Sequence, residues 1–218
     1  MSLSKELIEF MRWYQEKFDD EDIDFEQLYD EAGSYSKRSK FPANSSLERQ
    51  LTDMLLGADI DFLSQIDFIP SRAFKYNSGL KLFKCPNHIR EIGQASFAFC
   101  TNLQTFVFPE TLELIGTQAF RGIENLGEVT LPDSLEILSG GTFSISKIQK
   151  ISIGPKTKLA FHEFSGSMIR QLEFRGTAQQ FQQSNLWKGR AIKFGQCSID
   201  EILCSDGQIP TEEFYQND

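Results

Sequence analysis

Apolar residues recur along the chain at a fixed interval of 23 residues, and this period is its most regular feature. The clearest column is a phenylalanine that follows a small residue, at Phe74, Phe97, Phe120 and Phe143. A period of this length is the sequence signature of a solenoid, in which one short structural unit repeats along an axis. Five further columns keep the same interval: Leu80, Leu103 and Leu126; Phe83, Phe106 and Val129; Pro86, Pro109 and Pro132; Ile89, Leu112 and Leu135; and Ile69, Ile92, Ile115 and Leu138.

Each repeat predicts one short β-strand, for example residues 103–108. Leu103, Phe106 and Phe108 would point inward, because side chains alternate between the two faces of a strand. Pro109 would end the strand, since proline has no N–H group to donate to a neighbouring strand. We therefore expect a mostly β solenoid in which the inward side chains of stacked units form the core.

A second short extended or turn segment follows each proline, for example residues 112–115. Gly93 and Gly116 come directly after these segments, where we expect a tight corner that needs the conformational freedom of glycine. The repeated phenylalanine comes next and is expected to stack on the phenylalanine of the neighbouring unit. The connections between strands are therefore predicted to be turns or 3₁₀ segments.

The repeat extends beyond its four clearest units and covers about residues 58–176, or about five and a half repeats. The interval drifts downstream, where Phe164 is the last phenylalanine of the series. The apolar positions that continue the columns are Ile60, Phe62, Ile66 and Ile69 upstream, and Ile148, Ile151, Ile153, Ile169, Leu172 and Phe174 downstream.

The segments IREIGQASFAFCTNLQTFVFPETLELIGTQAF and LGEVTLPDSLEILSGGTF resemble the BspA-type leucine-rich repeat. Its typical unit has a strand, a proline, two spaced aliphatic residues, a glycine, then Ala-Phe and often a cysteine, whose place Cys100 takes. The segments LEFRGTAQQFQQ and CSIDEILCSDGQI resemble the closing part of such arrays, so the resemblance covers about residues 58–209. It implies a leucine-rich-repeat solenoid with a binding role. Many relatives are secreted or surface-attached adhesins, whereas this chain has few repeats and shows no secretion signal.

A solenoid exposes its core at both ends unless each end is capped. Residues 45–57 predict an N-terminal cap helix, because Ser45 and Glu48 have capping-box spacing and Gly57 follows the apolar stripe Leu47, Leu51, Met54 and Leu55. Residues 177–218 predict a small C-terminal β cap and tail. Its strands are expected at 191–194 and 199–204, with a turn at 205–207.

Residues 1–44 predict an acidic helical extension and a polar, locally basic connector. The net charge is −9, and residues 1–31 contribute −8 of it, with 11 acids and 3 bases. Two helices are expected there, and their apolar stripes must pack either on the solenoid or on a partner or second copy of the chain. The stripes are Leu3, Leu7, Phe10, Met11, Tyr14 and Phe18, widened by Ile8 and Trp13, and then Phe25, Leu28, Tyr29 and Ala32.

This charge distribution disfavours direct binding to nucleic acid, which needs clustered Lys and Arg. The acidic segment is either solvated or meets a basic partner. The chain shows neither an apolar run that would span a bilayer nor a signal peptide at its start. We therefore expect a cytoplasmic protein without membrane attachment, whose cysteines at 85, 100, 197 and 204 are thiols.

Candidate chemistry is sparse. Asp20, Asp22, Asp24 and Glu31 have the spacing of a calcium-binding EF-hand loop, but Phe25 stands where that loop needs glycine. The cysteines lack zinc-site spacing. The cluster of residues 162–165 (His-Glu-Phe-Ser) lies on an extended or turn segment that would point its side chains apart. The sequence thus predicts no enzyme, no metal and no cofactor.

The remaining candidate site is the outer face of the strands, where solenoids bind their partners. Two outward positions per strand form two parallel columns across the sheet. One column is Asp59, Leu82, Thr105, Glu128, Lys150 and Gln171, and the other is Asp61, Lys84, Val107, Thr130, Ser152 and Glu173.

We therefore expect a non-enzymatic scaffold that binds another protein on this strand face, through its acidic helices, or through both. The helix residues expected to contact a partner or a second copy are Ile8, Trp13, Glu16, Asp19, Asp20, Asp22 and Asp24. An inhibitor of a host factor, encoded by a virus or phage, would fit this description. The alternatives are an acidic mimic of nucleic acid that blocks a basic groove, and a surface adhesin or carbohydrate binder.

Overall fold

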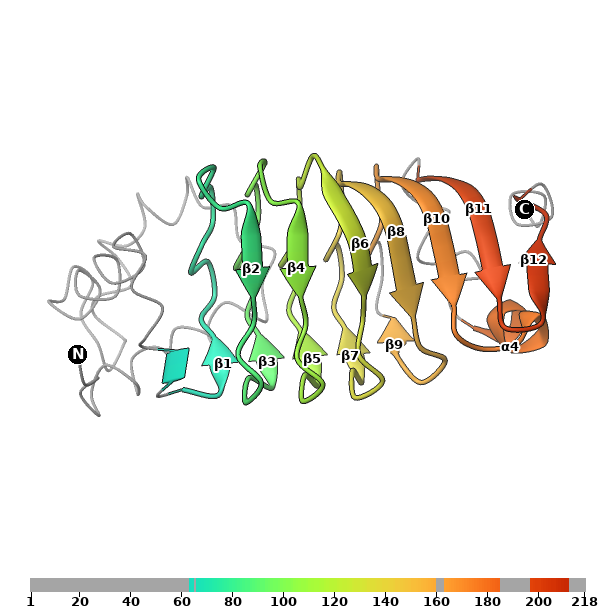
Figure 1. Ribbon diagram of the computed structural model, residues 1–218, viewed down its shortest axis with the longest axis horizontal. Coiled ribbons are helices and arrows are strands. Elements are labelled where there is room, and N and C mark those ends of the chain that lie inside the picture. The colour runs from blue at the N-terminus through green and yellow to red at the C-terminus, as the bar shows by residue number, and fades with distance from the viewer. Residues whose placement is uncertain (1–62, 65, 160–162, 185–196, 212–218) are drawn as a thin grey trace, which may run out of the picture.

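The computed structural model describes residues 63–64, 66–159, 163–184 and 197–211. These residues form an elongated stack of coils, and each coil adds one strand to a long sheet and one short strand to a sheet on the opposite side (Figure 1). The predicted solenoid is therefore confirmed. The cap helix at 45–57, the helices and connector of 1–44, the first strand at Ile60 and Phe62, and the strand at 191–194 lie outside the described residues.

The front sheet consists of the longer strands, which run side by side in Figure 1. Most pair in parallel, with Phe83 beside Phe106 in one pair and Val129, Ile151 and Leu172 aligned across three strands. The pair β2–β4 continues into the other strands through the Gly127 N–H, which donates to Gln104 O at 2.9 Å. The strands are β2 (Leu82–Lys84), β4 (Thr105–Val107), β6 (Leu126–Thr130), β8 (Lys147–Ile153), β10 (Met168–Phe174), β11 (Ser198–Cys204) and β12 (Gly207–Ile209).

The back sheet is parallel throughout and is made of two-residue strands. Its members are β1 (Phe68–Ile69), β3 (Glu91–Ile92), β5 (Leu114–Ile115), β7 (Ile137–Leu138) and β9 (Lys158–Leu159). Apart from the half-buried Leu80, the predicted columns of aliphatic residues are buried between the two sheets. Ile92, Leu103, Leu112 and Ile115 have no solvent-exposed surface. The positions that the sequence predicts to point inward thus form the core.

The repeated phenylalanine lies at the corner that joins the back sheet to the front sheet, and successive rings form a stacked ladder. The centroids are 5.0 Å apart for Phe74 and Phe97, 5.3 Å for Phe97 and Phe120, 5.4 Å for Phe120 and Phe143, and 5.9 Å for Phe143 and Phe164. Interplanar angles do not exceed 16° in this ladder. The predicted stacking is confirmed.

The predicted reason for Gly93 and Gly116 is wrong, because neither has a positive φ angle. A Cβ atom on Gly116 would instead lie 2.8 Å from the backbone nitrogen of Gln94 and 2.9 Å from the carbonyl carbon of Gly93. Real Cβ atoms do not approach other atoms so closely. Glycine is required here because two successive coils touch through their backbones.

Residues with a positive φ angle, in the left-handed region, lie two positions before and two positions after the ladder phenylalanine. Around Phe74 they are Arg72 (φ 63°) and Tyr76 (φ 63°), and around Phe97 they are Ala95 (φ 50°) and Phe99 (φ 59°). The same places in the next coils are held by Gln118, Gly122, Gly141 and Ile145.

This backbone geometry lets each corner bond to the next coil. The N–H groups of Arg72, Phe74 and Tyr76 donate to the carbonyls of residues 94, 96 and 98 at 2.7–2.9 Å, while Ala73 and Lys75 donate back within their own corner. Residues 95, 97 and 99 repeat the pattern toward the third coil. The strain of non-glycine residues at positive φ is therefore offset by a complete set of backbone hydrogen bonds.

The solenoid changes after β10, where the chain forms the short helix α4 (Ala178–Gln183). Thr177 and Gln180 form a capping box, and Phe181 is buried with its ring 5.2 Å from that of Phe174. Strand β11 then pairs with β10 in parallel, and β12 turns back against β11 through the predicted turn at 205–207. The predicted C-terminal strands 199–204 thus continue the front sheet, and β12 closes it.

Candidate binding surface

The outer face of the front sheet displays most of the predicted surface residues. Leu82 and Val107 are 62% and 44% exposed on neighbouring strands, although both are large and apolar. In the register of β2 and β4, Leu82 lies beside Thr105 and Lys84 lies beside Val107, so the two apolar residues are diagonal neighbours. All four side chains are exposed, as are Glu128 and Thr130 on β6.

The other half of this face has its polar side chains tied to one another. The Lys150 Nζ lies 3.0 Å from a Glu173 carboxylate oxygen, and the Gln171 amide donates to Glu201 Oε2 at 2.5 Å. The hydrogen bond from Lys150 lowers the pKa of Glu173 below its usual value, although the partial burial of the Glu173 carboxylate raises it. Lys150, Gln171 and Glu173 are all half-buried.

Ser152 does not form part of an accessible column, because only 2% of its surface is exposed. Arg175 covers it and donates from Nη1 to the Ser152 hydroxyl at 2.9 Å. The Nη2 atom of Arg175 donates to Leu131 O at 2.6 Å and to Asp133 Oδ1 at 2.7 Å. Arg175 thereby joins three successive strands. Ser152 is therefore buried rather than displayed on the open surface, and its expected contact with a partner stays a prediction.

The front face therefore divides into two parts. The open half comprises Leu82, Lys84, Thr105, Val107, Glu128 and Thr130, and the cross-linked half comprises Lys150, Ser152, Gln171 and Glu173. The other predicted contact residues (Ile8, Trp13, Glu16, Asp19, Asp20, Asp22, Asp24, Asp59 and Asp61) lie outside the described residues, as does the EF-hand-like loop at 20–31.

A second surface was not predicted from the sequence. The rings of Tyr76 and Phe99 stack at 5.2 Å, and Tyr76 is 65% exposed. Lys75 Nζ lies 4.8 Å from the centroid of the Tyr76 ring, and the Arg121 guanidinium carbon lies 5.8 Å from that of Phe99. We call Arg72, Lys75, Tyr76, Phe99 and Arg121 the cation–aromatic ridge.

The ridge concentrates positive charge. Burial lowers the pKa of Lys75, and the nearby Arg72 and Arg121 guanidinium groups lower it further. Gly122 leaves room for the Phe99 ring, because a Cβ atom on Gly122 would lie 2.5 Å from Phe99 Cδ1. The sequence signal that was available is the run RAFKY at residues 72–76, in which an aromatic residue and two cations flank the ladder phenylalanine.

The four cysteines are thiols, as expected. Burial raises the pKa of Cys85, Cys100 and Cys197 to about 12, and that of Cys204 to about 11. Cys100 donates from Sγ to Phe74 O at 3.0 Å. Ser146 and Ser167, at the same place in later coils, donate to the carbonyls of Phe120 and Phe143. Cys100 is thus a hydrogen-bond donor between coils.

The candidate metal-ligating side chains of the described residues do not gather into a metal-binding group. No cluster of three or more His, Cys, Asp or Glu side chains among them is placed to hold a metal ion. In the 162–165 cluster, His162 lies outside the described residues, Glu163 is buried and Ser165 is half-buried. None of the described helices is long and apolar enough to cross a membrane.

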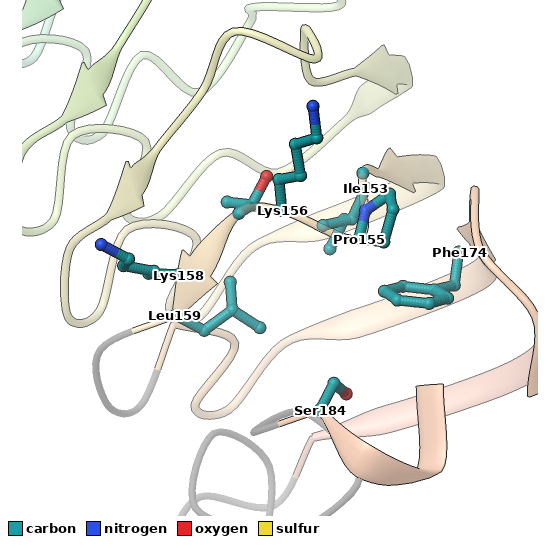
Figure 2. A pocket seen from close by; sticks show the side chains of 9 residues that line it. Ile153, Pro155, Lys156, Lys158, Leu159, Phe174 and Ser184 are labelled. Carbon is teal, nitrogen blue, oxygen red and sulfur yellow. The ribbon is translucent and has the colours of Figure 1, made fainter. Parts of the chain in front are cut away.

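A hollow of ≈ 240 Å³ lies between the β8–β9 connection and α4 (Figure 2). Ile153, Leu159 and Phe174 give it apolar walls, and Lys156 and Lys158 extend away from it. None of the described residues that line it is Asp, Glu, His or Cys.

Comparison with known proteins gives one match. The family model of the BspA type leucine-rich repeat region matches residues 67–193 in 6 copies. Neither a curated protein nor a solved structure matches the chain. The matched residues span more than half of the chain and include strands β1 to β10. The chain belongs to the family of BspA type leucine-rich repeat proteins.

Proposed function

We propose that this protein is a non-enzymatic scaffold that binds another protein on the open half of its front face. Solenoids in general bind partners along such continuous faces. The observation that supports this site is the exposure of Leu82 and Val107 on adjacent strands of a regular, parallel sheet. Because the two side chains are 62% and 44% exposed, their burial by a partner would contribute roughly 1–2 kcal/mol each.

Charge supports the choice of the open half over the cross-linked half. Within the described residues, Lys84 and Glu128 form no ion pair, whereas Lys150 and Glu173 pair with each other. A partner can therefore pair with Lys84 and Glu128 without first breaking an interaction. The proposed centre of the site is Leu82 and Val107, with Lys84, Thr105, Glu128 and Thr130 around it.

The test is affinity capture from the native host's lysate, with wild-type protein compared with the double variant Leu82→Glu, Val107→Glu. Ile137→Glu is the matched control, because Ile137 is a 39% exposed apolar residue on the back sheet. Partners should be lost by the double variant and retained by the control, at equal melting temperatures. A partner list that the double variant leaves unchanged would exclude this surface.

A second candidate function is a mimic of nucleic acid, favoured by the 11 acids and 3 bases of residues 1–31. Deletion of residues 1–43 separates the two functions. Loss of binding, together with loss of its salt dependence, would favour mimicry, and retained binding favours the front face. The narrower ideas of a viral or phage inhibitor and of a surface adhesin are tested by the identity of the captured partner.

A further inference from the structure

The cation–aromatic ridge offers a recognition surface separate from the front face. It spans three successive coils, with Arg72, Lys75 and Tyr76 at the first corner, Phe99 at the second and Arg121 at the third. Since neighbouring coils are about 4.8 Å apart, the ridge extends over roughly 10 Å. Lys75 and Arg121 lie beside these aromatic rings, and the buried Arg72 guanidinium adds its charge nearby, so the ridge suits an anionic peptide that also has aromatic side chains.

Such a peptide occurs in this chain. Residues 19–31 (DDEDIDFEQLYDE) contain 8 acids and no base, together with Phe25 and Tyr29. Residues 32–62 separate this segment from Leu63, the first described residue, which precedes the ridge by less than one coil. A chain of that length reaches up to roughly 100 Å when extended, so the connection permits contact within one molecule.

We propose that the acidic segment 19–31 binds the cation–aromatic ridge of the same chain. Its carboxylates pair with Lys75 and Arg121, the buried Arg72 guanidinium adds positive charge to the site, and an aromatic side chain packs on the exposed Tyr76 ring. Tethering favours this intramolecular contact over an external acidic peptide, because it acts as an effective concentration of about millimolar. The segment then occupies the ridge and leaves the front face accessible.

Carbodiimide cross-linking of the full-length protein tests the contact, because it joins a lysine amine directly to a carboxylate. Lys75 is the only amine in the ridge. We expect peptides in which Lys75 is linked to an acid of residues 19–31. The links should weaken as salt screens the charges. An equal mixture of ¹⁵N-labelled and unlabelled protein identifies the donor molecule, and the proposal predicts links without mixed isotopes.

Two variants sharpen the result. Arg72→Glu, Arg121→Glu should reduce these links by about fivefold or more, since the Arg121 pairing is lost and two positive charges of the ridge are replaced by negative ones. Asp19→Asn, Asp20→Asn, Asp22→Asn should reduce them while leaving the ridge intact, which covers the case that the first variant fails to fold. Links from Lys158 provide the control and should not change in either variant.

The proposal is overturned if Lys75 links only to acids outside residues 19–31. Mixed-isotope links would also overturn it, because they assign the segment of a second copy to the ridge. The experiment contains no external partner, so its outcome does not depend on the proposed function of the front face.

Discussion

The ring of Phe97 lies parallel to the ring of Phe120, with 5.3 Å between their centroids and 5° between their planes. Phe106 of the front sheet meets both rings edge-on, at 4.9 Å and 4.8 Å. Stacked and edge-on contacts are the favoured geometries of aromatic pairs. The core thus links the corner of one coil to the strand and corner of the next, and no coil completes it alone.

Replacement of Phe120 by alanine should lower the free energy of unfolding by roughly 3–5 kcal/mol, because it leaves a cavity in the centre of this cluster. Urea denaturation measures the change. Tyr76→Ala is the control, since Tyr76 is mostly exposed and should cost much less. Equal effects of the two substitutions would contradict the ladder as the core of the fold.

Gly116→Ala should destabilise the protein by about 1–3 kcal/mol, because its Cβ would overlap the backbone of Gln94 and force the coils apart. Gly79→Ala provides the comparison, since the nearest atom to its Cβ is the Asn77 side-chain oxygen at 3.4 Å. Thermal unfolding of both variants measures the difference. If Gly116→Ala melts like the wild type, the contact between the backbones is not tight.

Arg175→Met should lower the free energy of unfolding by roughly 1–3 kcal/mol, because it removes the hydrogen bonds to Ser152, Leu131 and Asp133. Arg90→Met is the matched control. The Arg90–Glu113 pair is solvent-exposed, and such pairs contribute less than about 1 kcal/mol. If Arg175→Met lowers the free energy of unfolding no more than Arg90→Met does, the hydrogen bonds of Arg175 across three strands contribute little to stability.

The thiols should weaken the fold at high pH. The pKa of Cys85, Cys100 and Cys197 is raised from 9.0 to about 12 by burial, so the unfolded chain releases these protons at lower pH than the folded chain does. Their contribution to stability is complete below pH 9 and is lost as the pH rises toward 12. Urea denaturation between pH 8 and 11 should show that the free energy of unfolding declines less steeply with pH in the double variant Cys85→Ala, Cys100→Ala than in the wild type. Identical slopes would contradict the raised values.

The solenoid and its core columns could be predicted from the sequence because the same apolar positions recur in every unit. The left-handed corners could not, since Arg72, Ala95, Gln118 and Gly141 share one backbone geometry but no side-chain property. Hydrogen bonds between coils impose that geometry, and the sequence of a single repeat does not indicate which of its residues form them.

The candidate site was predictable only in part. Strand alternation correctly gave the outward direction of Leu82 and Val107. It could not show that Arg175, from the following coil, covers Ser152, or that Lys150 and Glu173 pair across two strands. The cation–aromatic ridge also depends on contacts between three coils, so the spacing of residues within one coil did not indicate it.

The most direct test of the proposed binding face is the affinity of the captured partner, measured by isothermal calorimetry for three proteins. Wild type and Ile137→Glu should bind with the same Kd. The double variant Leu82→Glu, Val107→Glu should bind at least about a hundredfold more weakly, since it loses two apolar contacts. An unchanged Kd for the folded double variant would contradict the account.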